Sequence, residues 1–256
     1  MNFPFVLYIK TLNEYMKPQI IEDNSEDIGA HNSNLEESIV RIDKSNMYED
    51  LSTIIICPTR GMFPTRVVQS WMKLQKPLSQ NVYGPIFAES MKVDAAYNSL
   101  ISYILGHEVL SKCKYILTIE EDNLPPLDGL LKLYESMKEY DVVGGLYWSK
   151  GKEGFPMLFG DPEKGIDDHV PQIPKQGELQ HVNALGMGFN LFKLDMFKQI
   201  EGPWFKTLEG IGENGVEQKV TQDMYFYKKA GKLGYKFACD NRILVGHYDH
   251  NADKVW

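Results

Sequence analysis

Cysteines and long apolar runs are both scarce in this chain of 256 residues. The three cysteines, Cys57, Cys113 and Cys239, are odd in number, far apart and without C-x-x-C spacing. This pattern argues against a disulfide framework or a zinc site and favours buried free thiols in a reducing compartment. The apolar residues 1–9 have no basic region before them and no cleavage pattern after them, so we expect neither a signal peptide nor a membrane span. A cytoplasmic location is the resulting expectation.

Positive charge is also in short supply. The chain has 27 lysines and arginines against 35 aspartates and glutamates, which gives a formal net charge of -8. Such a balance gives no excess of positive charge to attract a bare polyanion, so tight binding to nucleic acid is not expected. The hydrophobic fraction of 43% is that of a soluble globular protein.

Residues 1–50 differ in character from the rest of the chain. After the apolar start, residues 10–50 are polar and acidic, with few apolar residues at a regular spacing. They predict an acidic N-terminal extension or loosely docked arm, which is available for contact with a partner. Residues 51–256 are expected to form one domain.

Three strand-helix units open this domain. Strands are expected at 53–57, 85–88 and 114–120, and helices at 67–74, at 94–110 and after Pro126. This alternation predicts an α/β fold with a doubly wound, mostly parallel central sheet flanked by helices. A ligand should then lie across the carboxyl ends of the strands.

The second half of the domain is less regular. Residues 149–180 are rich in Gly, Pro, Asp and Lys and have no sustained period, which is typical of a functional, flexible loop. Further elements are expected at 142–148, 183–192 and 194–200, in a helix over 222–230 ended by Gly231, and in two strands at 235–239 and 242–246.

The most informative stretch is Glu120-Glu121-Asp122, which follows the apolar run 116–119. Alternation along a strand sends Glu120 and Asp122 to one face and Glu121 to the other. Carboxylates at the exposed end of a strand are well placed to hold a hard divalent cation that phosphates also bridge. The alternative is that acidic residues merely finish a strand and begin a turn.

Four motifs in order resemble those of GT-A glycosyltransferases, particularly family-2-like enzymes and small bacteriophage-encoded glycosyltransferase-like proteins. Glu120-Glu121-Asp122 resembles the D-x-D motif with Glu for the first Asp, and Gly186-Met187-Gly188 resembles the glycine loop. Thr221-Gln222-Asp223 resembles the x-E-D motif with Gln for Glu, and His247 matches the C-terminal metal-binding histidine. The resemblance covers residues 52–249.

The resemblance implies a divalent metal, Mn²⁺ or Mg²⁺, held by Asp122 and His247. An imidazole ligand mildly favours manganese, although His247 can also be a structural residue and nearby His250 can compete for the role. Asp223 is implied as the general base, whereas an acidic residue in a first helical turn needs no catalytic purpose. The residues implied to bind the sugar donor are Pro58, Thr59, Arg60, Glu89, Glu120, Glu121, Asp122, Gly186, Met187 and Gly188.

The function implied is a metal-dependent transfer of a sugar from a nucleotide-diphosphate donor, UDP- or GDP-linked, to a hydroxyl acceptor. A non-catalytic nucleotide- or carbohydrate-binding module in a larger assembly is one rival. The other is a sugar nucleotidyltransferase, which would want a basic, glycine-rich loop after the first strand, where this chain has Arg60-Gly61-Met62-Phe63. A glycan, a protein or a modified nucleic acid remain open as acceptors, in the host cytoplasm if the protein is phage-encoded.

Overall fold

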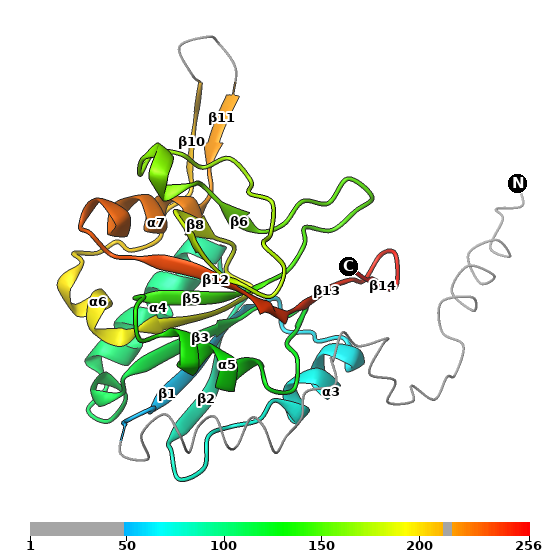
Figure 1. Cartoon of the computed structure of the whole chain (residues 1–256). Helices are drawn as coiled ribbons and strands as arrows, with labels where there is room; N and C mark the ends of the chain where they lie inside the picture. Colours follow the sequence, from blue (N-terminus) through cyan, green and yellow to red (C-terminus); the bar gives the residue numbers. More distant parts are fainter. Residues whose placement is uncertain (1–48, 212–216) are drawn as a thin grey trace, which may run out of the picture.

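The structure is a computed structural model that describes residues 49–211 and 217–256. All but the last two residues of the expected arm, 1–50, lie outside the described part. The described residues build one seven-stranded sheet with helices on both faces (Figure 1). Its strands are β1 (Thr53–Thr59), β2 (Val82–Glu89), β3 (Tyr115–Ile119), β5 (Val142–Leu146), β7 (Leu179–Val182), β9 (Phe189–Lys193) and β12 (Phe237–Leu244).

The strand order is β2-β1-β3-β9-β5-β12-β7. Five strands run in one direction, because β1 is parallel to β2 and β3, and β12 is parallel to β5. The strand between them, β9, is antiparallel to both β3 and β5, and the edge strand β7 is antiparallel to β12. The predicted mostly parallel, doubly wound α/β sheet is therefore confirmed.

Central strands are apolar on both faces because both faces are covered. The side chains of Ile54, Ile56 and Cys57 in β1 are fully buried, and every residue of β3 and β5 is buried. Continuous apolar runs of this kind belong to sheets sandwiched between helices. All three cysteines are free and buried, as the sequence predicts.

The two faces carry different helices. On one face lie α4 (Val93–Gly106), α6 (Leu194–Gln199) and α7 (Gln222–Lys232), where Phe226 of α7 packs on Phe197 and Phe205 with ring centroids 5.5 and 4.9 Å apart. On the other face α5 (Gly129–Ser136) and α3 (Thr65–Lys73) contribute to a second apolar cluster. Figure 1 shows these two layers on either side of the sheet.

Several predicted boundaries are wrong. The helix after Pro126 begins only at Gly129, and the helix over 94–110 ends at Gly106, before a 3₁₀ turn at Leu110–Lys112. Gly231 lies inside α7, and the chain reverses instead at Gly234, whose φ of 89° is in the region that glycine favours. The two strands expected at 235–239 and 242–246 form the single strand β12.

Several two- and three-stranded sheets lie outside the central sheet. The strands β14 (Lys254–Val255), β13 (Gly246–Asp249) and β4 (Asn123–Leu124) form a three-stranded sheet, and β10 (Leu208–Ile211) pairs with β11 (Glu217–Val220). The segment expected as a flexible loop, 149–180, contains β6 (Leu158–Phe159), which pairs with β8 (Ala184–Leu185), and a 3₁₀ turn at Pro162–Lys164. Within the described residues, no helix is long and apolar enough to cross a membrane.

Candidate functional site

The three carboxylates lie in a turn between β3 and β4. The expected strand 114–120 ends at Ile119, and the Glu120 amide donates a hydrogen bond to the carbonyl oxygen of Gly188, 3.2 Å away. The side chains of Glu120, Glu121 and Asp122 then contact different partners. Each of the three acids therefore has its own hydrogen-bond partners and its own degree of burial.

Glu121 joins the ends of β1 and β3. Its carboxylate accepts hydrogen bonds of 2.7 Å from the Thr59 hydroxyl and 2.8 Å from the Arg60 amide, and it forms an ion pair with the Arg60 guanidinium. Glu121 is 8% exposed, whereas the Arg60 side chain is 83% exposed. The contacts of Glu121 are therefore internal, and Arg60 is the member of the pair that faces solvent.

Asp122 meets His247 because β13 pairs with β4. The register places His247 opposite Asn123, and the Tyr248 amide donates a 2.7 Å hydrogen bond to the carbonyl oxygen of Asp122. His247 Nε2 consequently lies 3.6 Å from Asp122 Oδ1. The predicted pairing of these two side chains in space is thus found in the structure.

A third side chain, Lys150, completes this cluster. Its ammonium lies 2.5 Å from Asp122 Oδ2. Burial alone would raise the pKa of Asp122, but hydrogen bonds from His247 and Lys150, together with their charges, lower it to about 2. Asp122 is therefore an anion at any physiological pH.

The ligand chemistry of this cluster suits a divalent cation only in part. His247 Nδ1 lies 2.7 Å from the carbonyl oxygen of Trp148, an atom that can only accept, so Nδ1 carries a hydrogen. Nε2 then faces Asp122 at 3.6 Å; a protonated ring donates from Nε2 to the carboxylate, and a neutral ring has its lone pair there for a cation. In the parts of the chain that the structure describes, no three His, Cys, Asp or Glu side chains converge to hold a metal ion. Two protein ligands are enough for a cation whose other ligands are phosphate oxygens and water. The residues fit such a shared site and not a closed one.

Glu120 lies on the interior side of the turn. Burial, followed by the negative charges of Asp122 and Asp223, raises the pKa of Glu120 to about 8. The Tyr97 hydroxyl is 3.4 Å from Glu120 Oε1. Glu120 is accordingly protonated at neutral pH in the absence of a bound cation, which is a different state from that of Asp122.

Asp223 stands at the start of α7 with Thr221 in the N-cap position. The Thr221 hydroxyl and the Met224 amide both donate hydrogen bonds to Asp223 Oδ1, the second at 2.9 Å. Burial raises the pKa of this carboxyl, which is 7% exposed. The negative charge of Asp223 is one of the causes that raise the pKa of Glu120, so the two acids, distant in sequence, interact electrostatically.

The glycine segment Gly186-Met187-Gly188 packs against protein side chains. A Cβ on Gly186 would collide with the Tyr147 hydroxyl, and one on Gly188 would lie 2.8 Å from Asn123 Oδ1. Met187 is 2% exposed and belongs to the main apolar cluster. The close approach that these glycines permit in the structure is therefore to Tyr147 and Asn123.

A cavity of about 460 Å³ opens beside the acidic turn. It lies between the loop after β1 and the turn after β13, and its charged and polar lining includes Arg60, Glu121, Asp122, Lys150 and His250. Of the ten expected donor-binding residues, three line this cavity, Arg60, Glu121 and Asp122. The other seven do not: Pro58, Thr59, Glu89, Glu120, Gly186, Met187 and Gly188.

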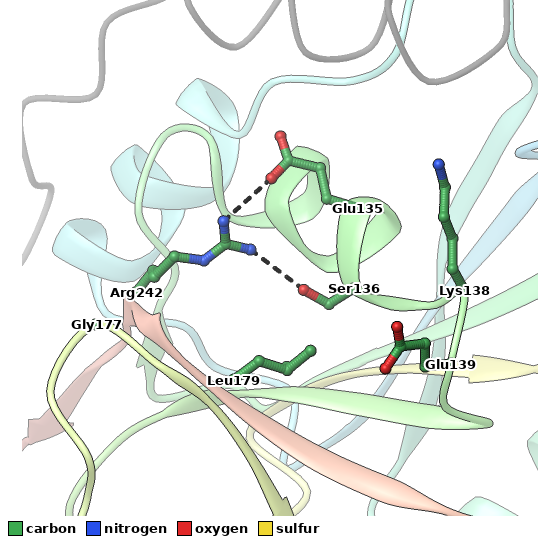
Figure 2. A pocket seen from close by; sticks show the side chains of 7 residues that line it. All are labelled: Glu135, Ser136, Lys138, Glu139, Gly177, Leu179 and Arg242. Carbon is green, nitrogen blue, oxygen red and sulfur yellow. Dashed lines mark hydrogen bonds and ion pairs between the residues drawn. The ribbon is translucent and has the colours of Figure 1, made fainter.

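A second cavity, of about 390 Å³, lies far from these residues, beside the C-terminal end of α5 (Figure 2). Its main cation, Arg242, already contacts Glu135 at 3.3 Å and the buried Asp240 at 2.6 Å. The Arg242 guanidinium also donates to the Ser136 hydroxyl. These internal partners satisfy the guanidinium, so Arg242 is not a free charge for a ligand of the second cavity.

Sequence reasoning missed Lys150, Tyr97 and Tyr147 as neighbours of the acidic turn. Lys150 is one lysine of a Gly- and Lys-rich segment, and nothing in its local sequence distinguishes it. Tyr97 occupies an apolar position of α4 that predicts only packing. For Tyr147, the run 142–148 predicted a strand but not its contact with the glycine segment.

The fold can be compared with those of solved structures. A197 from STIV aligns over 80% of this chain and 92% of its own, with a TM-score of 0.56 and 17% identity. The glycosyltransferase GalNAc-T7, solved with UDP, GalNAc and Mn²⁺, aligns over 78% of this chain and 44% of its own, with a TM-score of 0.50 and 10% identity. The chain has a GT-A-type fold. At these identities the likeness concerns the fold alone.

Other comparisons add little. TarS from S. aureus, solved in complex with UDP-GlcNAc, aligns at 13% identity over 75% of this chain and 58% of its own, but the TM-score is 0.39. No protein-family model matches the sequence. No curated protein matches it either. The function must therefore be argued from the site.

Proposed function

We propose that this protein is a metal-dependent glycosyltransferase that moves a sugar from a nucleotide-diphosphate donor to a hydroxyl acceptor. The observation that carries the proposal is the pairing of β13 with β4, which sets His247 Nε2 3.6 Å from Asp122 Oδ1 beside a cavity of about 460 Å³. In open α/β sheets, ligands bind at the carboxyl ends of the parallel strands, and the cavity lies at that edge. The fold shared with GalNAc-T7 supports the same reading.

The nucleotide diphosphate would occupy this cavity. Arg60 and Lys150 supply positive charge on its lining, and Met62 and Phe63 supply an apolar surface for a base. A site of this composition suits an anion with an aromatic group better than it suits a neutral sugar alone. UDP and GDP are the nucleotides that we expect it to take.

Asp122 and His247 would hold the divalent cation. When bound, Mn²⁺ or Mg²⁺ offsets the negative charge that develops on a departing diphosphate. Two features of the chain favour cation binding: the lowered pKa keeps Asp122 ionised, and the hydrogen bond to the Trp148 carbonyl oxygen orients the His247 ring. Neither residue needs to transfer a proton.

Asp223 is the proposed general base. Thr221 and Met224 bind Oδ1, which leaves Oδ2 to receive the proton of the acceptor hydroxyl. Burial raises the pKa of this carboxyl and so makes it a better proton acceptor than an exposed aspartate. Glu120, on the interior side of the acidic turn with the Tyr97 hydroxyl 3.4 Å from Oε1, would contact the sugar donor and not act as the base.

A nucleotide-release assay tests the proposal. UDP-, GDP- and TDP-sugars are offered with and without Mn²⁺, and nucleotide release that requires the metal is the expected result. The variant Asp122→Asn should abolish metal-assisted nucleotide binding. Its matched control is Asp141→Asn, because Asp141 is also held by a lysine, Lys193 at 3.0 Å, but precedes β5 and so lies at the opposite edge of the sheet.

The outcomes separate the candidate functions. Nucleotide affinities unchanged by EDTA, by Asp122→Asn and by His247→Ala would remove the metal site from the proposal. Metal-dependent nucleotide binding without turnover on any sugar or acceptor would favour the non-catalytic binding module.

A further inference from the structure

Lys150 forms an ion pair with Asp122, the carboxylate that is the proposed metal ligand. Its ammonium lies 2.5 Å from Asp122 Oδ2, while the other oxygen, Oδ1, faces His247. Lys150 also lines the cavity of about 460 Å³. The same side chain is therefore close both to the proposed metal ligand and to the space proposed for the diphosphate.

The backbone around Lys150 is tied to the histidine. The preceding Trp148 accepts the hydrogen bond from His247 Nδ1, and Trp148 forms a bridge with Pro156 that closes a short hairpin. Within it, the Ser149 amide donates a 2.9 Å hydrogen bond to the Phe155 carbonyl oxygen. The hairpin thus positions Lys150 and orients His247 at the same time.

The ion pair between Lys150 and Asp122 can be exchanged. The two side chains are 31% and 20% exposed, so water reaches the pair, screens its attraction and can solvate each charge when the pair separates. An ammonium bound to Asp122 repels a divalent cation that approaches the same carboxylate. Each cation should therefore weaken the binding of the other.

We propose that Lys150 is an exchangeable counter-ion of Asp122, which leaves the carboxylate when a metal ion binds and then contacts the diphosphate of the nucleotide. The inference rests on the proposed function: its first half on the metal site at Asp122 and its second half on the nucleotide site. Lysine is suited to this exchange because its flexible stem carries a point charge that binds carboxylate or phosphate equally well. Lys150 is on this account a positioning and binding residue and takes no part in proton transfer.

The test measures metal and nucleotide separately. Mn²⁺ alone is titrated into nucleotide-free protein and followed by the electron paramagnetic resonance signal of free Mn²⁺. We expect Lys150→Met to bind Mn²⁺ about fivefold more tightly than the wild type, the equivalent of removing one competing exposed ion pair. Calorimetry with UDP at saturating Mn²⁺ should show binding about tenfold weaker in the same variant, because a charged hydrogen bond to phosphate is lost.

Two variants serve as controls. Lys150→Arg keeps the positive charge and should stay within about threefold of the wild type in both measurements. Lys193→Met removes the lysine of the Lys193–Asp141 pair, whose side chains are 39% and 25% exposed, at the far edge of the sheet, and should change neither affinity. Thermal unfolding of each variant confirms that it is folded.

The results distinguish the inference from the function on which it rests. An unchanged or weaker Mn²⁺ affinity in Lys150→Met overturns the exchange at Asp122, whether or not any nucleotide binds. Tighter Mn²⁺ binding with unchanged UDP affinity overturns the contact with the diphosphate. A wild-type protein that binds Mn²⁺ but neither UDP nor GDP overturns the proposed function, and the competition at Asp122 is then judged from the metal titration alone.

Discussion

Replacing Glu120 with glutamine makes the cost of burying this acid measurable. In the folded chain, burial and the charges of Asp122 and Asp223 raise the pKa of Glu120 from 4.5 to about 8. Below pH 4.5 the folded and unfolded states both hold the proton. Between pH 4.5 and pH 8 the unfolded chain releases it and the folded chain keeps it, so rising pH favours unfolding.

The magnitude follows from the shift. One proton held only by the folded state changes the free energy of unfolding by ~1.4 kcal/mol per pH unit. Because Glu120 is partly exposed and solvent screens its neighbours, we expect a total of about 2 kcal/mol across the interval. Glutamine is neutral at every pH and keeps nearly the same shape, so E120Q should lack this component and be the more stable protein at pH 8.

Urea unfolding of both proteins at several pH values between 5 and 8, without metal, measures the effect. The difference between the unfolding free energies of E120Q and the wild type should grow with pH, since the titrating groups distant from Glu120 are shared by both proteins and cancel. The control is E139Q, which changes an exposed glutamate beside the second cavity and should give no such trend. A difference between E120Q and the wild type that stays constant over this range would show that Glu120 is ionised in the folded protein and would refute the reasoning.

Three further predictions concern the base, the glycine segment and the loop. Asp223→Asn should lower turnover on an identified acceptor by about 10² while sugar-donor affinity stays nearly intact, as measured by steady-state kinetics and calorimetry, and a near-normal rate would reduce Asp223 to a helix-end residue. Gly186→Ala should destabilise the protein by about 1–3 kcal/mol in denaturant unfolding, because its Cβ would collide with the Tyr147 hydroxyl. Gly151→Ala is the comparison: a Cβ there meets no atom within 4 Å, so any loss of stability comes from its φ of 103° alone. Cleavage by protease within 149–180 should be suppressed by UDP with Mn²⁺, and equal cleavage with and without these ligands would mean that the segment is no lid.

Much of the fold can be predicted from local pattern. The mainly apolar segments at 53–57 and 114–120 predict β1 and β3, because strands buried on both faces have apolar residues at most positions. Apolar residues at helical spacing predict α4 in the same way, because one face of that helix packs against the sheet. The order of motifs predicts that Asp122 and His247 meet, and they do.

Strand direction and helix boundaries are harder to predict from the sequence. The run 183–192 predicts order but not that β9 enters the sheet between β3 and β5 in the antiparallel sense. Gly231 was expected to end a helix, yet α7 continues through it because the chain reverses at Gly234. These choices depend on which neighbours a segment finds, and no single segment contains that information.

The sequence by itself determined the α/β class, the burial of the three cysteines and the position of Glu120, Glu121 and Asp122 at the end of a strand, because each follows from polarity and spacing along a short stretch. Only the tertiary structure decided what each acid does. Pairing of β13 with β4 brings His247 to Asp122, a hairpin places Lys150 on the same carboxylate, and burial with the charges of Asp122 and Asp223 raises the pKa of Glu120. Three adjacent carboxyl groups thus acquire different charges and partners, since the pKa and the contacts of an ionisable group depend on residues that folding brings together from distant parts of the chain.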